Sequence, residues 1–103
     1  MNPDLSVNVA GLKLRNPTML ASGVLGISGK TLKRVADSGA GAVVTKSCGI
    51  EAREGFPNPT VVEVPCGLLN AFGLPNPGVE AIREEIAEAK GAKIPVIASV
   101  YGF

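Results

Sequence analysis

The chain has 103 residues, of which 46% are hydrophobic and 18% charged, and its formal net charge is +1. This composition argues against intrinsic disorder, and the near-neutral charge gives no reason to expect binding to nucleic acid or to an anionic membrane. The absence of histidine excludes Cys/His zinc sites and Ser-His or Cys-His nucleophile pairs within these residues. The length favours a single small domain, and 13 glycines and 8 prolines predict many tight turns.

The first half of the chain predicts a hairpin followed by a strand-helix-strand unit. Apolar and polar residues alternate over 5–14, with a turn at Ala10-Gly11, which predicts a β-hairpin. A short apolar run predicts a buried strand near 18–21. A helix over 29–38 is indicated by helical spacing of apolar residues and by Gly39 as a stop. A second buried strand near 42–46 ends at Lys46.

The second half repeats that order after a long irregular stretch. Weak alternation predicts a hairpin of 60–64 with 67–70. Pro77 favours the start of a helix over 78–90, and 95–100 predict a third buried strand. Strands that alternate with helices indicate parallel pairing with right-handed crossovers. Three parallel strands do not close a barrel, so we expect an α/β chain that forms the first part of a longer domain.

Two glycine-containing segments suggest ligand sites. Residues 22–31 lie between a strand and a helix, as in a phosphate-binding P-loop, but Val24 stands where that motif needs its first glycine. We therefore favour an ordinary loop with a surface Lys30. In residues 70–78, Asn70 and Asn76 offer amide groups, and glycines allow a planar ligand to approach. Turn formation explains the same residues and is favoured without further context.

Charged and thiol residues give three further candidates. Lys46 follows a buried strand, at the sheet edge where parallel α/β folds bind ligands, although its side chain could instead reach solvent. Glu51 and Glu54 suggest an acid/base pair, but an ion pair of Arg53 with a neighbour in a structured loop is favoured. For the cysteines we favour buried, inert thiols. The two thiols are Cys48 and Cys66.

No targeting segment is evident in the sequence. The N-terminus does not combine a basic start with an apolar core, and no apolar run reaches about 18 residues. We expect a cytoplasmic protein that does not span a membrane, with both thiols reduced.

Five motifs together resemble the N-terminal part of dihydroorotate dehydrogenase, most closely the catalytic subunit of class 1B. They are Leu-Arg-Asn-Pro at 14–17, Leu-Ala-Ser-Gly at 20–23, Val-Thr-Lys-Ser at 44–47, Arg-Glu-Gly-Phe-Pro-Asn-Pro at 53–59 and Leu-Asn-Ala-Phe-Gly-Leu-Pro-Asn-Pro-Gly at 69–78. The resemblance covers the whole chain, and the last motif is the most specific. Dihydropyrimidine dehydrogenase and dihydrouridine synthase are related flavin barrels that remain alternatives, as does a non-enzymatic truncated fragment.

The resemblance implies a TIM (β/α)8 barrel that carries FMN, of which residues 1–103 form the hairpin and the first three β/α units. It implies FMN contacts from Ala21, Ser22, Gly23, Lys46, Ser47 and Ser99. Ser99 stands where many members have asparagine, which weakens that assignment. It implies contacts with dihydroorotate or orotate from Lys46, Asn70, Ala71, Phe72, Gly73 and Leu74.

The resemblance also implies groups that residues 1–103 do not contain. The catalytic base, a cysteine in class 1B, and the FMN phosphate site belong to later parts of the barrel, so this chain by itself is expected to be inactive. Neither Cys48 nor Cys66 matches the base. The implied partners are a second copy in a homodimer and, for class 1B, a subunit with FAD and an iron–sulfur cluster that passes electrons to NAD.

Overall fold

The computed structural model describes residues 3–103. Within these residues, seven strands, two α-helices and two short 3-10 helices follow one another. In order they are β1 (Val7–Val9), β2 (Leu12–Leu14), β3 (Met19–Leu20), η1 (Val24–Gly26), α1 (Gly29–Asp37), β4 (Ala42–Val44), β5 (Val61–Val64), β6 (Gly67–Asn70), α2 (Val79–Ala89), η2 (Lys90–Ala92) and β7 (Val96–Ile97).

The central sheet has the strand order β3-β4-β7, and both pairings are parallel. Met19 pairs with Ala42, and Val43 pairs with Val96. Helix α1 connects β3 to β4, and α2 lies between β4 and β7 in the chain, so the expected alternation of strands and helices is present. Because the three strands run in one direction, their carboxyl ends all lie at the same edge.

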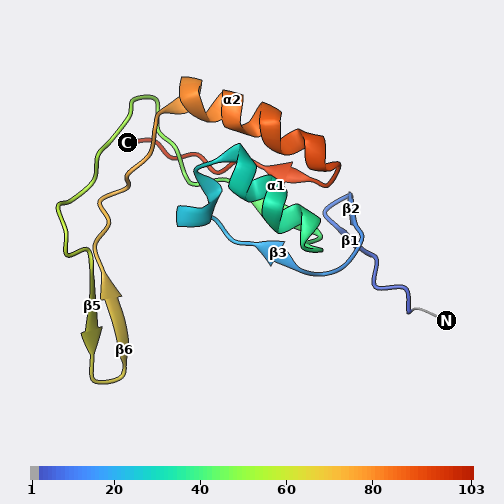
Figure 1. Cartoon of the computed structure of the whole chain (residues 1–103), viewed down its shortest axis with the longest axis horizontal. Helices are drawn as coiled ribbons and strands as arrows, with labels where there is room; N and C mark the ends of the chain where they lie inside the picture. The colour runs from blue at the N-terminus through green and yellow to red at the C-terminus, as the bar shows by residue number, and fades with distance from the viewer. Residues whose placement is uncertain (1–2) are drawn as a thin grey trace.

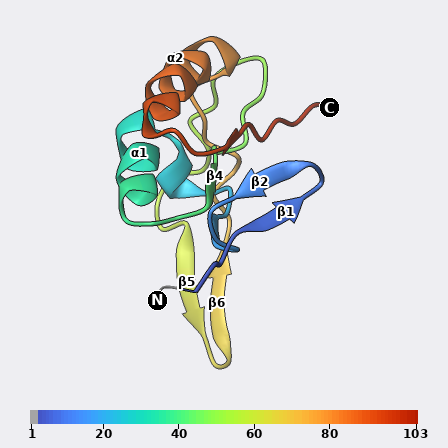
Figure 2. The same cartoon turned by 90° about the vertical axis from the view of Figure 1, so that its right-hand side faces the viewer.

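Both helices pack against the central strand. Leu32 of α1 and Ala89 of α2 form a buried cluster with Val43 of β4. The two helices lie side by side in both views (Figures 1 and 2). The carboxylate of Glu85 on α2 accepts a 2.6 Å hydrogen bond from the backbone N–H of Gly29, at the start of α1. The negative charge of Glu85 at the start of α1 complements the helix dipole. The carboxylate occupies the position at the helix N-terminus where a P-loop binds phosphate.

Two antiparallel hairpins flank this unit, both close to their expected ranges. The hairpin β1–β2 is followed by Arg15 and Asn16, whose side chains bond the carbonyls of Ala40 and Gly39 at 3.0 and 2.7 Å. These bonds hold the chain after the hairpin at the amino end of β4. The hairpin β5–β6 points away from the helices (Figures 1 and 2).

The regular strands are shorter than expected from the sequence. The pattern predicts strands at 42–46 and 95–100, whereas β4 ends at Val44 and β7 at Ile97, with a separate parallel bridge between Cys48 and Val100. The expected burial of both sheet faces is incomplete within the described residues, since Met19 is 43% exposed. No helix in residues 3–103 is long and apolar enough to cross a membrane.

Gly29 is required by the contact between the two helices, and its replacement tests that contact. A β-carbon at Gly29 would overlap the carbonyl of Glu85 and the side chain of Glu88. We expect Gly29→Ala to lower the free energy of unfolding by about 1–3 kcal/mol, the usual cost of overpacking. The measurement is thermal or urea unfolding. Gly67→Ala is the matched control, because a β-carbon there meets nothing within 4 Å. Equal stability of the two variants would contradict this account of the helix contact.

Candidate functional site

Three serine hydroxyls form a chain along the carboxyl edge of the sheet. Ser22 follows β3, Ser47 follows β4 and Ser99 follows β7. The Oγ of Ser47 lies 3.2 Å from the Oγ of Ser22 and 2.6 Å from the Oγ of Ser99. Parallel α/β folds bind ligands at this edge because the strand ends and the loops after them leave polar groups available there.

Lys46 is a half-buried cation at the same edge. Its backbone N–H donates a 3.0 Å hydrogen bond to the carbonyl of Gly26, and its Nζ lies 5.9 Å from the centre of the Phe72 ring. Within residues 3–103 the ion pair formed is Arg83 with Glu80 on the surface of α2, and Lys46 has no carboxylate partner. A cation that is partly removed from water and not neutralised is suited to bind an anion.

The loop after β3 contains two glycines with different surroundings. A β-carbon at Gly26 would overlap the backbone of Val44 to Lys46, so this glycine lets η1 lie directly against the end of β4. Gly23 has an extended backbone, with φ 167°, and a β-carbon there meets nothing within 4 Å. Neither the backbone conformation nor a neighbour in the described chain requires glycine at Gly23, and the space beside it is open.

The segment 70–74 approaches the sheet edge through one side chain. Phe72 contacts Lys46, as given above, and its carbonyl accepts a 2.9 Å hydrogen bond from the N–H of Phe56. Asn70 is the exposed last residue of β6, and its amide makes no hydrogen bond within residues 3–103. Gly73 and Leu74 both have positive φ, 80° and 58°. Of the residues expected to bind substrate, Lys46 and Phe72 are therefore in contact with each other.

Asn76 organises the loops beside the site. It is 6% exposed, and its Oδ1 accepts hydrogen bonds from the N–H groups of Gly49 and Gly78. Its Nδ2 donates to the carbonyl of Leu74 at 2.9 Å and to the hydroxyl of Tyr101 at 3.0 Å. The sequence alone favours turn formation for this residue, and the structure confirms that use.

The expected ion pair of Arg53 is absent from the described residues. Arg53 exchanges two backbone hydrogen bonds with Asn76, and its Nε donates to the carbonyl of Gly73. Its guanidinium lies 5.8 Å from the centre of the Phe103 ring. The backbone pairing, rather than a carboxylate, fixes this loop, and Glu51 and Glu54 are both exposed.

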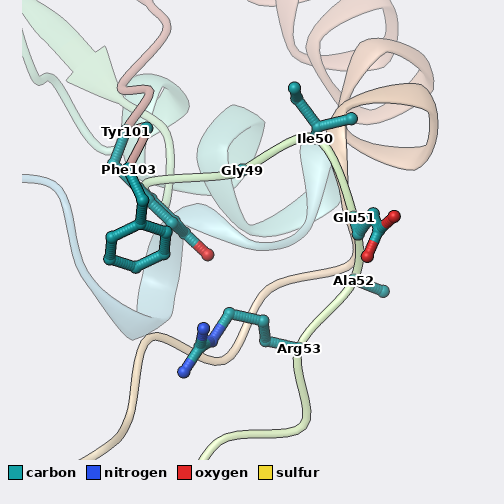
Figure 3. A pocket seen from close by; sticks show the side chains of 8 residues that line it. Gly49, Ile50, Glu51, Ala52, Arg53, Tyr101 and Phe103 are labelled. Atoms are coloured by element: carbon teal, nitrogen blue, oxygen red, sulfur yellow. The ribbon is translucent and has the colours of Figure 1, made fainter.

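A cavity of about 370 Å³ is lined by residues other than those of the site, and Figure 3 shows its lining. Residues 49–53 line one side, and Tyr101, Gly102 and Phe103 line the other. None of the residues expected to bind cofactor or substrate lines this cavity.

The two cysteines differ in exposure. Cys48 is buried, as expected, whereas Cys66 is exposed in the turn between β5 and β6, so the expectation of a buried thiol is wrong there. The residues of a tight two-residue turn have few neighbours to cover them. Residues 3–103 hold no cluster of acidic and thiol groups suited to a metal ion.

The two asparagines allow a matched test of structural against site roles. We expect Asn76→Ala to lower the free energy of unfolding by about 2–4 kcal/mol, because each buried group left without a partner costs about 1–3 kcal/mol. Asn70→Ala should change stability by less than about 0.5 kcal/mol, as exposed substitutions usually do. Thermal unfolding of both variants provides the measurement. A larger loss for Asn70→Ala would reverse these roles.

Comparison with known proteins identifies the family. The model of the family described as dihydroorotate dehydrogenase matches residues 4–103. The chain is 52% identical over 100 residues to "Dihydroorotate dehydrogenase B (NAD(+)), catalytic subunit" of Thermoplasma volcanium, covering 97% of this chain and 33% of that protein. It is 53% identical over 98 residues to the protein of the same name from Pyrococcus abyssi, covering 95% and 32%. The chain thus spans about a third of the length of these relatives.

Solved structures share the fold at lower identity. A crystal structure of DHODH from Eimeria tenella in complex with ferulenol has a TM-score of 0.81 at 18% identity, covering 96% of this chain and 29% of that one. The ligand-free form from the same organism has a TM-score of 0.78, also at 18% identity, covering 96% and 30%. At this identity the likeness concerns the fold alone.

Proposed function

The chain belongs to the dihydroorotate dehydrogenase family, and we propose that it forms the first three β/α units, with their preceding hairpin, of an FMN-carrying TIM barrel. On this proposal residues 1–103 are part of one domain, in a catalytic subunit of class 1B. The full-length enzyme oxidises dihydroorotate to orotate in pyrimidine biosynthesis. The observation that carries the proposal is the unneutralised Lys46 beside the serine chain at the carboxyl edge of the sheet.

The loop after β3 fits a flat cofactor. Gly23 leaves open space that nothing in the described chain fills, and its backbone conformation does not call for glycine. A glycine is explained there if a ring system lies against the backbone. Ala21 and Ser22 are exposed beside it, and Ser47 and Ser99 continue the row of hydroxyls that would face the flavin. FMN, when bound, supplies a hydride acceptor for the oxidation.

The substrate half of the site is built around Lys46. Dihydroorotate carries a carboxylate, and the ammonium group of Lys46 is a half-buried cation without a carboxylate partner in residues 3–103. Phe72, in contact with Lys46, limits the directions that this side chain can take. The backbone and amide groups of Asn70 to Leu74 would hydrogen-bond the pyrimidine. Cys48 is buried and is not proposed as the base, which we assign to a later part of the barrel.

The full-length enzyme would work with a second subunit. We propose that this subunit carries FAD and an iron–sulfur cluster and passes electrons to NAD, in line with the "(NAD(+))" and "catalytic subunit" in the names of the relatives. A homodimer of the catalytic subunit in the cytoplasm completes the proposal. The family match and these names do not favour dihydropyrimidine dehydrogenase or dihydrouridine synthase.

Replacement of Lys46 tests the carboxylate contact in the full-length enzyme. A buried charged pair that loses one partner costs about 2–5 kcal/mol. Since about 1.36 kcal/mol corresponds to a factor of ten in rate, we expect Lys46→Ala to lower kcat/KM for dihydroorotate by at least about 30-fold. Steady-state kinetics with an artificial acceptor provide the measurement.

The controls for this test are two other lysine variants. Lys46→Arg keeps a cation and should retain more activity than Lys46→Ala. Lys30→Ala removes an exposed lysine of α1 and should leave kcat/KM unchanged. A kcat/KM for Lys46→Ala within about twofold of the wild-type value would mean that this lysine only reaches solvent.

The 103-residue chain by itself provides a second test. We expect no measurable oxidation of dihydroorotate, because loss of a positioned base alone costs about 10²–10⁴-fold. FMN binding should be weak, since the phosphate site is assigned elsewhere. The unpaired edge of β7 is a template for another chain, so we also expect oligomers. Light scattering measures the size of the oligomers, and a flavin titration measures FMN binding. A monomer that binds FMN tightly would contradict the proposed division of the site.

A further inference from the structure

We propose that Thr45 is a positioning residue, whose buried hydroxyl holds open a one-residue bulge in the strand end that carries Lys46 and Ser47. This inference rests on the proposed function, because it concerns how Lys46 is aimed at the substrate. It is carried by the strand register and by the hydrogen bonds around Ser99.

The bulge is visible as a change of register between β4 and β7. Val44 pairs with Ile97, whereas the next bridge joins Cys48 to Val100. Three residues of the first segment, Thr45 to Ser47, therefore stand opposite two of the second. An extra residue of this kind bends a strand and redirects its side chains, and such bulges are common next to active sites. Here the extra residue falls within the segment that carries Lys46.

The hydroxyl of Thr45 fills the gap that the bulge leaves in the hydrogen-bond ladder. Before the bulge the ladder is regular, with the N–H of Thr45 donating to the carbonyl of Ile97 at 2.9 Å. At the bulge the N–H of Ser99 donates to the Oγ1 of Thr45 at 3.0 Å. Thr45 is 0% exposed, so water cannot replace this acceptor. Without the hydroxyl, the N–H of Ser99 would lose its partner or the register would shift.

Ser99 is consequently held on three sides. Its N–H is bound by Thr45, its carbonyl accepts from the N–H of Cys48 at 3.1 Å, and its hydroxyl contacts that of Ser47. Lys46 lies within this frame, and its own N–H is bound to the carbonyl of Gly26. The backbone of Lys46 is therefore fixed between Thr45 and Ser47. The direction of its ammonium group depends on the hydrogen bonds that hold these two residues and Ser99.

A set of variants in the full-length enzyme tests the positioning role. Thr45→Val keeps the shape of the side chain and removes the acceptor, and Thr45→Ser keeps the acceptor. Because a displacement on the order of 1 Å costs about 10²-fold in rate, we expect Thr45→Val to lower kcat/KM about 10- to 100-fold. Thr45→Ser should restore most of it. Val43→Ala is the control for buried packing in β4, two residues before Thr45, and should lower the unfolding midpoint while leaving kcat/KM near the wild-type value.

A double-mutant cycle with Lys46 distinguishes positioning from general structure. If Thr45 acts through Lys46, Thr45→Val should have little further effect on kcat/KM in a Lys46→Ala background. An undiminished effect in that background would overturn the proposal. So would wild-type kcat/KM in Thr45→Val, or a Thr45→Val protein that no longer folds, since the hydroxyl would then serve stability alone.

Amide hydrogen exchange separates this proposal from the proposed function. We expect the segment containing Cys48 and Ser99 to exchange faster in Thr45→Val and at the wild-type rate in Thr45→Ser. Exchange that is unchanged in Thr45→Val would overturn the role of the hydroxyl, whatever the activity. A wild-type enzyme that does not oxidise dihydroorotate would overturn the proposed function, while the exchange result would still decide whether Thr45 holds the bulge.

Discussion

The parallel pairing of β4 with a neighbour on each side is the constraint on which the described structure depends. Because β4 is the middle strand, its side chains face packed surfaces, and Ala42, Val43 and Thr45, the residue after the strand, are almost completely buried. Parallel strands also need helical crossovers, which place α1 and α2 against β4. The same pairing brings the residues that follow all three strands to one edge. The parallel pairing of β4 with β3 and β7 thus accounts for both the core and the position of the candidate site.

The two ends of this sheet are used differently. At the amino end of β4, the side chains of Arg15 and Asn16 bond the carbonyls of the turn after α1, which fixes the preceding hairpin to the body of the fold. At the carboxyl end, the serine hydroxyls bond to one another, and the ammonium group of Lys46 lies near the Phe72 ring with no carboxylate partner in residues 3–103. Bonds satisfied within the chain stabilise it, whereas polar groups left without such partners are available to a ligand.

The order and type of the strands and α-helices could be predicted from the sequence, because they follow from the spacing of apolar residues. That spacing does not indicate the two short 3-10 helices, η1 and η2. The helices α1 and α2 begin and end within one residue of the expected positions. The early end of β4 could not be predicted in this way. Apolar residues continue to Val44 and again from Cys48, and no pattern of side chains reveals that the register changes between them. The change depends on a hydrogen bond between segments far apart in the chain.

The candidate site could be predicted only in part for a similar reason. A cation at a strand end indicates a ligand edge, so Lys46 stands out in the sequence. Asn70 and Asn76 are the same residue type in one motif, yet one is exposed and the other is a buried centre of four hydrogen bonds. What separates them is the position of Gly49 and Tyr101, which the local sequence does not contain. The same limit applies to Thr45, which resembles any β-branched strand residue.

The two halves of the site differ in what holds them. Ser22, Lys46 and Ser99 follow strands of a sheet with a buried core, whereas residues 71–74 follow a two-stranded hairpin whose Leu68 is 74% exposed. An isolated hairpin is only marginally stable in water. The base of the β5–β6 hairpin is instead fixed by close backbone contact between residues 53–56 and 72–76. Arg53 and Asn76 exchange two backbone hydrogen bonds, and the N–H of Phe56 donates to the carbonyl of Phe72.

Glycine makes that contact at the base of the hairpin possible. A β-carbon at Gly55 would overlap the carbonyl of Phe72, and one at Gly73 would overlap the backbone and ring of Phe56. Both glycines also have φ of 80°, which disfavours other residues. Two glycines from different segments therefore set how closely residues 53–56 and 72–76 approach each other. Residues 71–74, which we propose contact the substrate, are positioned by backbone contact between loops, whereas Lys46 and the serines proposed to face the flavin are positioned by the packed sheet.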